Sequence, residues 1–222
     1  MKRYLPFVIV GAVALITVGS GVALYRAKRT PPPAPKKNSM ATVAEGNQGL
    51  HARGNAKATV TLEEFGDFQC PPCATMAGML KGIEEKYGAR LRLLFHHFPL
   101  AIHVHAREAA LASEAAYLQG RFWEMHDLLY QEQLIWTKAP DVPALFNSYA
   151  ARIGLDVERF KKDMQSPEAK GRVAADQKRG TARGVTSTPT IFINDVVVPA
   201  TSLNPTDLHA AIDAALKEKT AP

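Results

Sequence analysis

This 222-residue chain contains only two cysteines, and they lie close together in the sequence Cys70-Pro71-Pro72-Cys73. Proline is tolerated at the first position of a helix, where its missing N–H would have no helical partner. Pro71 therefore predicts a helix start, with Cys70 at the N-cap and Cys73 at the third helical position. Side chains three positions apart lie on one face of a helix, so the two sulfurs can approach and form a disulfide.

The expected position of Cys70 makes it the more reactive thiol. A helix N-terminus presents unpaired N–H groups and the positive end of the macrodipole, and both favour a thiolate. The thiolate is the nucleophile in thiol–disulfide exchange. Cys73, one turn deeper and facing inward, is expected to be the resolving thiol.

Pro72 limits how strongly the thiolate can be stabilised. An N-cap side chain normally accepts a hydrogen bond from the N–H of the second or third helical residue. The second residue here is Pro72, which has no N–H, so Cys73 and Ala74 remain as donors to Cys70. We expect a thiolate that is stabilised, but less than it would be with a donor-bearing residue at position 72.

The surrounding residues predict a strand–helix–strand unit. Residues 59–62 are β-branched or apolar, which favours a strand. A helix is expected from Pro71 to about Tyr87, with Gly88 as its stop, and a second strand over residues 90–98. The strands of such a unit lie parallel, and Cys-x-x-Cys beside it indicates a thioredoxin-like redox site.

The rest of the chain predicts a helical insertion, a hairpin and a closing helix. Apolar residues recur at helical spacing between positions 103 and 184, a stretch too long for a loop. Residues 190–193 and 196–198 flank Asn194-Asp195, which suits a two-residue hairpin turn, and Asn204-Pro205 is expected to begin the last helix. The order is β-α-β, helices, β-β-α, which is an α/β fold. The apolar stripes expected in the core are Phe122, Met125 and Leu129, then Leu145, Tyr149 and Ile153, then Val157, Phe160 and Met164.

The N-terminal part predicts a membrane segment and a tether. Leu5 to Leu24 is a run of uncharged, mostly apolar residues, long enough to span a bilayer as a helix. We favour a retained anchor over a cleaved signal peptide, whose apolar region is shorter. Residues 30–49 are Pro-rich and polar, typical of an extended linker. The expected division is 1–29 anchor or signal, 30–49 linker and 50–222 folded domain, with its helical insertion at about 101–184.

The net charge of +6 does not indicate a nucleic-acid partner. Residues 1–39 contain seven basic residues and no acidic ones, so the remainder holds 20 basic and 21 acidic residues. The expected folded domain is therefore close to neutral, without the basic balance that phosphate binding requires.

Four motifs of this chain belong together: Phe65-Gly-Asp-Phe-Gln-Cys-Pro-Pro-Cys73, His97-Phe-Pro-Leu100, Gln119-Gly-Arg-Phe-Trp-Glu-Met-His126 and Thr188-Pro189-Thr190. Together they resemble the motifs of the DsbA-type thiol:disulfide oxidoreductases, in particular the membrane-tethered bacterial branch. The resemblance covers about residues 45–218 and implies the thioredoxin-like fold. The Pro-Pro dipeptide departs from the Pro-His that strong oxidants of this kind often carry.

The resemblance implies roles for particular residues. Cys70 is similar to the attacking thiol and Cys73 to the resolving thiol, and Pro189 to a cis-proline that faces the disulfide. The backbone of Thr188 would then be exposed to a substrate peptide that adds as a short strand, next to Pro71 and Pro72 at the substrate-binding surface.

An acidic residue beneath the disulfide is also implied by the resemblance. Glu64 matches the position of a buried acid that could move a proton to or from Cys73. Glu63 is the competing residue, and strand alternation must send the two side chains to opposite faces.

The expected function is disulfide formation in extracytoplasmic proteins, with the active domain on the outer, periplasmic side of a bacterial cell membrane. Cysteine-containing substrate proteins and a membrane oxidant, quinone-linked by family analogy, are the expected partners, and no bound cofactor is required. A disulfide reductase or isomerase on the same fold is the first alternative.

A metal-binding module that uses Cys70 and Cys73 is the second alternative. A structural zinc site needs four ligands, and no histidine pair follows the cysteines at zinc-finger spacing, so no metal ligands are assigned. Packing or surface roles are expected for the seven histidines, and His96 and His97 should point to opposite faces of a strand. The histidines are His51, His96, His97, His103, His105, His126 and His209.

Pro72→His tests the effect of the missing N–H. The substitution restores a donor at the second helical position, and a hydrogen bond to a charged group contributes about 1.5–3 kcal/mol. We expect the pKa of Cys70 to fall by about one unit, measured from the ultraviolet absorbance of the thiolate against pH. An unchanged or higher pKa would contradict the argument.

Overall fold

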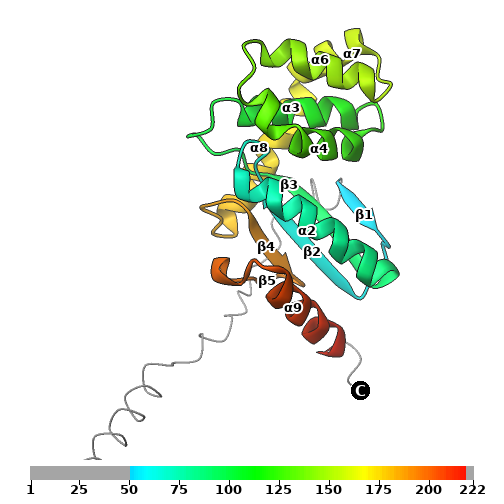
Figure 1. The fold of residues 1–222 in the computed structure, drawn as a ribbon, viewed down its shortest axis with the longest axis vertical. Helices are drawn as coiled ribbons and strands as arrows, with labels where there is room; N and C mark the ends of the chain where they lie inside the picture. The colour runs from blue at the N-terminus through cyan, green and yellow to red at the C-terminus, as the bar shows by residue number, and fades with distance from the viewer. Residues whose placement is uncertain (1–50, 219–222) are drawn as a thin grey trace, which may run out of the picture. The chain divides into compact units, whose positions relative to one another are not determined.

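A five-stranded sheet forms the centre of the fold in a computed structural model that describes residues 51–218 (Figure 1). The strand order is β1-β3-β2-β4-β5. Strands β2 and β3 are parallel, and the other neighbouring pairs are antiparallel. The strands are β1 (Ala52–Gly54), β2 (Val60–Gly66), β3 (Leu91–His97), β4 (Thr190–Ile193) and β5 (Val196–Val197).

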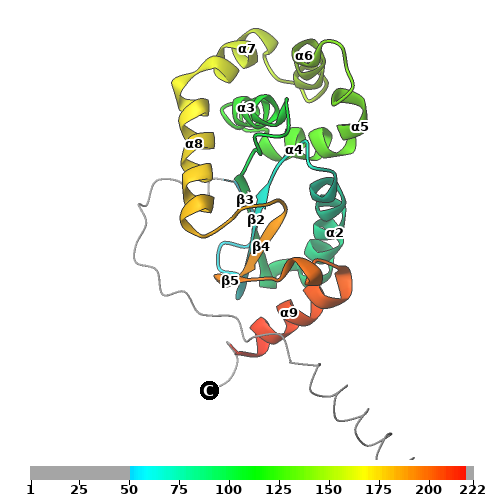
Figure 2. The same cartoon turned by 90° about the vertical axis from the view of Figure 1, so that its left-hand side faces the viewer.

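The helices divide into those that cover the sheet and those that form an insertion between β3 and β4. Helices α2, α8 and α9 pack against strands, whereas α3 to α7 lie beyond one end of the sheet (Figures 1 and 2). The helices are α2 (Pro71–Tyr87), α3 (Ala106–Tyr117), α4 (Phe122–Gln131), α5 (Gln133–Trp136), α6 (Val142–Arg152), α7 (Val157–Gln165), α8 (Pro167–Ala182) and α9 (Pro205–Glu218), with short 3-10 turns at Gly88–Arg90 and Ala200–Ser202.

The predicted β-α-β unit is confirmed. Strand β2 pairs with β3 in parallel, and α2 begins directly after Cys70 and ends before Gly88, whose φ is 51°. The hairpin turn is confirmed as well, because Asn194 and Asp195 have positive φ values of 46° and 68°.

Strand β1 was not predicted from the sequence. Its residues, Ala-Arg-Gly, have no strand chemistry, and the strand exists because it pairs with β3. Gly54 has a φ of 91°, and a Cβ there would lie 2.5 Å from the Leu91 carbonyl oxygen. A tertiary contact, not local preference, therefore creates this strand.

The two faces of the sheet are covered by different helices (Figure 2). Helices α2 and α9 cover one face with an apolar cluster that includes Leu62, Leu80 and Ile212. Helix α8 covers the other face, where Phe65 and Phe192 pack together. Because side chains alternate along a strand, neighbouring residues of β2 enter two different environments.

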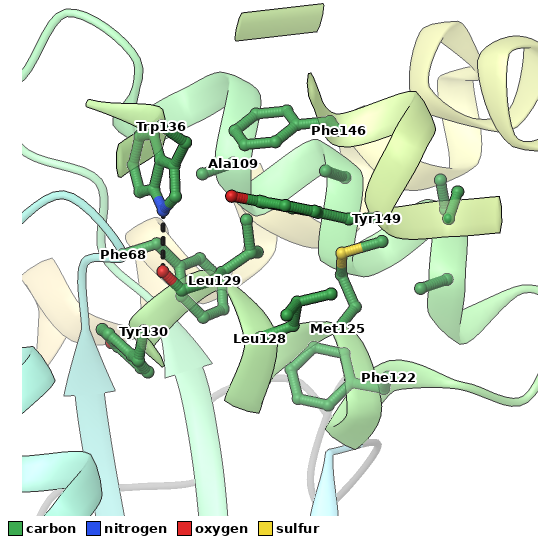
Figure 3. Packing of buried hydrophobic residues seen from close by; sticks show 14 of the residues in the cluster. Phe68, Ala109, Phe122, Met125, Leu128, Leu129, Tyr130, Trp136, Phe146 and Tyr149 are labelled. Atoms are coloured by element: carbon green, nitrogen blue, oxygen red, sulfur yellow. Dashed lines mark hydrogen bonds between the residues drawn. The ribbon is translucent and has the colours of Figure 1, made fainter. Parts of the chain in front are cut away.

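The helical insertion has its own apolar core (Figure 3). Eight of the nine residues of the predicted stripes are buried in it or packed against it, whereas Val157 is half-buried and lies outside it. The Trp136 indole N–H donates to the Leu129 carbonyl oxygen at 2.7 Å. This core also includes Cys70, Cys73 and Phe95, so the insertion and the start of α2 share one apolar interior.

A buried group of two histidines and a carboxylate joins the insertion to the sheet. The Oε1 atom of Glu114, a residue of α3, lies 2.7 Å from His51 Nε2 and 3.0 Å from His97 Nε2. These contacts hold the pKa of Glu114 down at about 2 against the opposing effect of burial. His96, on the opposite face, contacts Asp176 of α8 at 3.2 Å, so the two consecutive histidines do point to opposite faces.

The predicted membrane segment at residues 5–24 and the linker at residues 30–49 lie outside the described residues. Between residues 51 and 218, none of the helices combines the length and apolarity needed to cross a bilayer.

Gly66→Ala and Gly78→Ala should change stability in opposite directions. A Cβ on Gly66 would lie 2.5 Å from the Phe95 ring and 2.9 Å from the Tyr130 hydroxyl, whereas a Cβ on Gly78 in α2 meets nothing within 4 Å. We expect the free energy of unfolding to fall by about 1–3 kcal/mol for the first change and to rise by about 0.5–1 kcal/mol for the second. Denaturant unfolding measures both, and equal effects would contradict the assigned packing.

Candidate active site

The two cysteines lie at the first turn of α2, where the sequence predicted them. Cys70 is the N-cap residue, and both cysteines are free thiols. Cys73 is fully buried and Cys70 is 5% exposed, while Pro71 and Pro72 are exposed beside them. Both cysteines are therefore buried, and of the two only Cys70 keeps a small exposed area.

The environment of Cys70 favours its thiolate. Its pKa is lowered to about 6, chiefly by a hydrogen bond from the Cys73 thiol, then by the Thr188 side chain and the Cys73 N–H. Burial and the negative charge of Asp67 act in the opposite direction. This environment agrees with the predicted lowering of the Cys70 pKa. The largest contribution comes from the Cys73 thiol and not from the N–H groups of the helix.

The backbone donors behave differently from the sequence-based expectation. The N–H groups of Cys73 and Ala74 bond to the Cys70 carbonyl oxygen at 3.1 and 3.3 Å, and no hydrogen bond of capping geometry reaches the Cys70 sulfur. Ala74 is therefore no donor to the sulfur, because the first turn of the helix uses its N–H for a backbone bond. The Cys73 N–H makes only a smaller contribution to the thiolate.

Cys73 is held in its protonated form. Burial raises the pKa of the Cys73 thiol well above its ordinary value, and the hydrogen bond to Cys70 and the charge of Glu64 raise it further. The two thiols thus differ strongly in acidity although they are three residues apart.

Glu64 lies on the Cys73 side of the sheet and Glu63 on the other side. Glu64 is 1% exposed, and burial, with a smaller effect of Cys70, raises its pKa to about 8. Glu63 instead forms ion pairs with Arg183 and, at 3.4 Å, with Arg179 of α8. The alternation of β2 therefore favours Glu64 as the acid near the cysteines, as the sequence comparison with the family implied.

The segment before β4 faces Cys70 from the opposite side. The Thr188–Pro189 peptide bond is cis. The Cys70 thiol can donate to the Thr188 carbonyl oxygen, which lies 3.3 Å from its sulfur. Five predicted site residues, which lie in three separate parts of the sequence, thus meet here: Glu64, Cys70, Cys73, Thr188 and Pro189.

Asp67 holds the turn before Cys70, a role the sequence analysis did not assign. One carboxylate oxygen accepts from the Gln69 N–H at 2.7 Å, and the other contacts the Leu100 N–H at 2.9 Å and His103 Nδ1 at 2.7 Å. Asp67 is 1% exposed. An Asp two residues before a turn N–H is a common turn signal, but its long-range partners could not be read from the sequence.

Gln133 of α5 holds the same turn from the insertion. Its side-chain amide donates to the carbonyl oxygens of Phe68 and Cys70 at 2.7 and 3.0 Å. Gln133 is also buried. No local motif marks this residue, because its partners are more than 60 positions away.

The cysteines do not belong to a metal-ligand cluster in the described part of the chain. The group there whose geometry could hold an ion is His51, His97 and Glu114, which contains neither cysteine. The acidic Cys70 thiol, which keeps a small exposed area, lies beside a fully buried, protonated thiol and a protonated carboxyl group, and this arrangement suits thiol–disulfide exchange.

The family model that matches this chain agrees with this chemistry, whereas the curated relatives that it matches in part are named as antiporters. The family model described as thioredoxin matches residues 46–214. Among curated proteins, the chain is 40% identical over 149 residues to a Na(+)/H(+) antiporter NhaA 1 of Mycolicibacterium gilvum, covering 65% of this chain and 23% of that protein. It is 33% identical over 195 residues to an NhaA 1 antiporter of Salinispora arenicola, covering 82% and 29%. The chain spans about a quarter of the length of these relatives.

The comparisons with solved structures point to the same group of proteins. BdbD from Bacillus subtilis matches with a TM-score of 0.68 and 25% identity, over 76% of this chain and 94% of that one. A thioredoxin-like oxidoreductase from Silicibacter pomeroyi matches with a TM-score of 0.65 and 25% identity, over 79% and 100%. The alpha-DsbA1 protein of Wolbachia pipientis shares the fold at 20% identity, with a TM-score of 0.66 over 76% and 91%. With its paired thiols at the start of α2, the chain belongs to the thioredoxin family, among the DsbA-type thiol:disulfide oxidoreductases.

Proposed function

We propose that this protein donates disulfides to cysteine-containing proteins outside the cytoplasm. A substrate thiolate attacks the Cys70 sulfur of the oxidised enzyme, the Cys70–Cys73 bond breaks, and Cys73 leaves with the electron pair. A second substrate thiolate then attacks the substrate sulfur of the mixed disulfide, and Cys70 leaves as a thiolate. The substrate loses two electrons, and the enzyme gains them as a dithiol.

Each sulfur is suited to its step. Cys70 is a good leaving group because its pKa is about 6. Cys73 must take up a proton when it leaves, since its raised pKa makes the thiol the stable form. Glu64 is the proton donor in this mechanism, and Thr188 with Pro189 borders the place where the substrate chain meets Cys70.

The acidity of Cys70, at the start of α2 and opposite Thr188, is the observation that carries the proposed direction. A pKa lowered to about 6 stabilises the thiolate, and therefore the reduced enzyme that remains after a disulfide has been donated. Glu64, whose pKa is raised to about 8, is mostly protonated at neutral pH and can supply the proton that Cys73 takes up as it leaves. The same carboxylate would take that proton back in the reverse reaction, so Glu64 affects the rate and not the direction.

The proposed compartment and partners follow from this chemistry and from the N-terminal sequence. A reversible disulfide suits an oxidising compartment, and the apolar run at residues 5–24 would hold the domain at the outer face of a bacterial membrane. A membrane oxidant would remove the two electrons that each cycle leaves on the cysteines.

A disulfide reductase is the second candidate function. The pKa of Cys70, about 6, is nearer to the pKa of ~7 of the reactive cysteine in thioredoxin than to the pKa of ~3.5 in DsbA.

The reduction potential distinguishes the two candidate functions, and equilibration of the full chain with glutathione buffers measures it. We expect a value above about −200 mV, on the side of the disulfide donors in a range from about −270 mV to about −120 mV. A value below that limit would favour the reductase and overturn the proposed direction.

Glu64→Gln tests the proton donor, with Glu63→Gln as the matched control. Loss of a general acid commonly costs 10²–10⁴-fold, so we expect formation of the mixed disulfide to slow by about 10²-fold in Glu64→Gln. Glu63→Gln should keep the wild-type rate, because Glu63 faces Arg183 on the other side of the sheet. Stopped-flow reduction of the oxidised enzyme by a substrate peptide measures the rate.

The pH dependence of the rate of mixed-disulfide formation tests the role of Glu64 independently. After correction for the thiolate fraction of the substrate, the wild-type rate should fall as the pH rises through about 8, because Glu64 then loses its proton. Glu64→Gln should lack this fall. A wild-type rate and pH profile in Glu64→Gln would remove Glu64 from the mechanism.

A further inference from the structure

Asp67 brings a buried negative charge to the turn that carries Cys70. The Cys70 N–H donates to the Asp67 carbonyl oxygen at 3.1 Å, so the two residues lie in one tight turn. The Asp67 side chain is fully shielded from solvent, and its charge acts to raise the pKa of Cys70. Like charges repel each other strongly where little water separates them. The carboxylate that holds this turn therefore also opposes the thiolate on which thiol–disulfide exchange depends.

His103 contacts this carboxylate from the segment that follows β3. Its Nδ1 atom lies 2.7 Å from the Oδ2 atom of Asp67, the oxygen that also accepts from the Leu100 N–H. Because an ionised carboxylate only accepts hydrogen bonds, Nδ1 carries the proton of this contact. Within residues 51–218, His103 is the one ion-pair partner of Asp67. A hydrogen bond to a carboxylate is short and strong, so His103 can offset part of the Asp67 charge.

The fold fixes His103 in this place. The segment between β3 and α3 is bound to the active-site turn a second time, because the His105 N–H donates to the Gln69 side-chain oxygen at 2.7 Å. The His103 N–H closes a turn onto the Leu100 carbonyl oxygen at 3.0 Å. The His103 side chain is 19% exposed, so it lies between the buried carboxylate and solvent. Its contact with Asp67 is therefore built into the connection between β3 and α3.

We propose that His103 is a positioning residue for the exchange reaction, which binds the Asp67 carboxylate and offsets its charge at the Cys70 sulfur. Asp67 can then hold the turn through the Gln69 and Leu100 N–H groups without displacing the thiolate equilibrium of Cys70. No contact of His103 with either sulfur is found within residues 51–218, so its effect passes through Asp67. This inference rests on Cys70 as the exchanging sulfur, as in the proposed function, and applies to both directions of exchange.

His103→Ala removes the contact, and His105→Ala is its matched control. His105 lies in the same segment, but its ring contacts Glu108 at 3.2 Å instead of Asp67. His103→Asn keeps an amide donor near the position of Nδ1, whereas His103→Phe keeps a ring without a donor and replaces His103→Ala if that variant does not fold. The measurements on the full chain are the pKa of Cys70, from thiolate absorbance against pH, and the reduction potential in glutathione buffers.

We expect the pKa of Cys70 to rise by about half a unit in His103→Ala, less than the ~1–3 units that a charge in direct contact produces. The reduction potential should fall with it, because a less stable thiolate makes the reduced enzyme less stable. His103→Asn should restore most of the wild-type pKa, and His105→Ala should match the wild type. A general loss of stability would not produce this pattern.

Asp67→Asn tests whether His103 acts through the carboxylate. The substitution removes the charge that His103 offsets but keeps one oxygen that can accept from the turn. We expect the pKa of Cys70 to be the same in Asp67→Asn with and without His103→Ala, because two residues that act through one contact are not additive.

Three results would overturn the role of His103: an unchanged or lower Cys70 pKa in His103→Ala and His103→Phe, an equal rise in His105→Ala, or a further rise when His103→Ala is added to Asp67→Asn. The failure of the proposed function is distinguishable from these. A low reduction potential of the wild type would refute the proposed direction and leave the differences among the variants in place, whereas an unchanged Cys70 pKa in the His103 variants would refute the positioning role alone.

Discussion

The hydrogen bond from the Cys73 thiol to the Cys70 sulfur is the interaction on which the active site depends. It is the largest contribution that lowers the pKa of Cys70, and it also raises the pKa of Cys73. The contact thus contributes to the acidity of Cys70 and to the protonation of Cys73, although burial is the larger cause for Cys73. It requires the two sulfurs to lie on one face of the first turn of α2, and it requires one of them to be shielded from water.

The rest of the structure holds this turn in place from several sides. Asp67 connects it to the segment that follows β3, and Gln133 connects it to the insertion. Thr188 closes the third side, with its carbonyl oxygen 3.3 Å from the Cys70 sulfur. The helical insertion is therefore part of the active site, because its residues satisfy backbone groups of the turn that would otherwise be buried without partners.

The sheet separates two kinds of acidic residue that are neighbours in the chain. Glu63 faces Arg179 of α8 and Arg183, which follows this helix, and is compensated by their charges. Glu64 faces the apolar side that contains Cys73, where no cation compensates it among the described residues, and burial raises its pKa to about 8. A shift of one residue in strand register would exchange these environments, so the chemistry of Glu64 depends on the pairing of β2 with β3 and β4.

The sequence by itself determined the parts of the protein that depend on local patterns. The spacing of the cysteines and the position of Pro71 located the start of α2. β-Branched and other apolar residues, together with turn residues, located β2, β3 and the hairpin. The resemblance to a family added Pro189 and the choice of Glu64. Strand β1 could not be predicted, since its three residues form a strand only by pairing with β3.

Only the tertiary structure decided which distant side chains act on the cysteines. No local signal marks Gln133 or the long-range partners of Asp67, and the largest contribution to the acidity of Cys70 comes from the Cys73 thiol and not from backbone N–H groups. The physical reason is that the acidity of a buried group depends on the charges, dipoles and solvent within a few ångströms. These neighbours come from segments up to 118 residues away in the chain, and only folding brings them together.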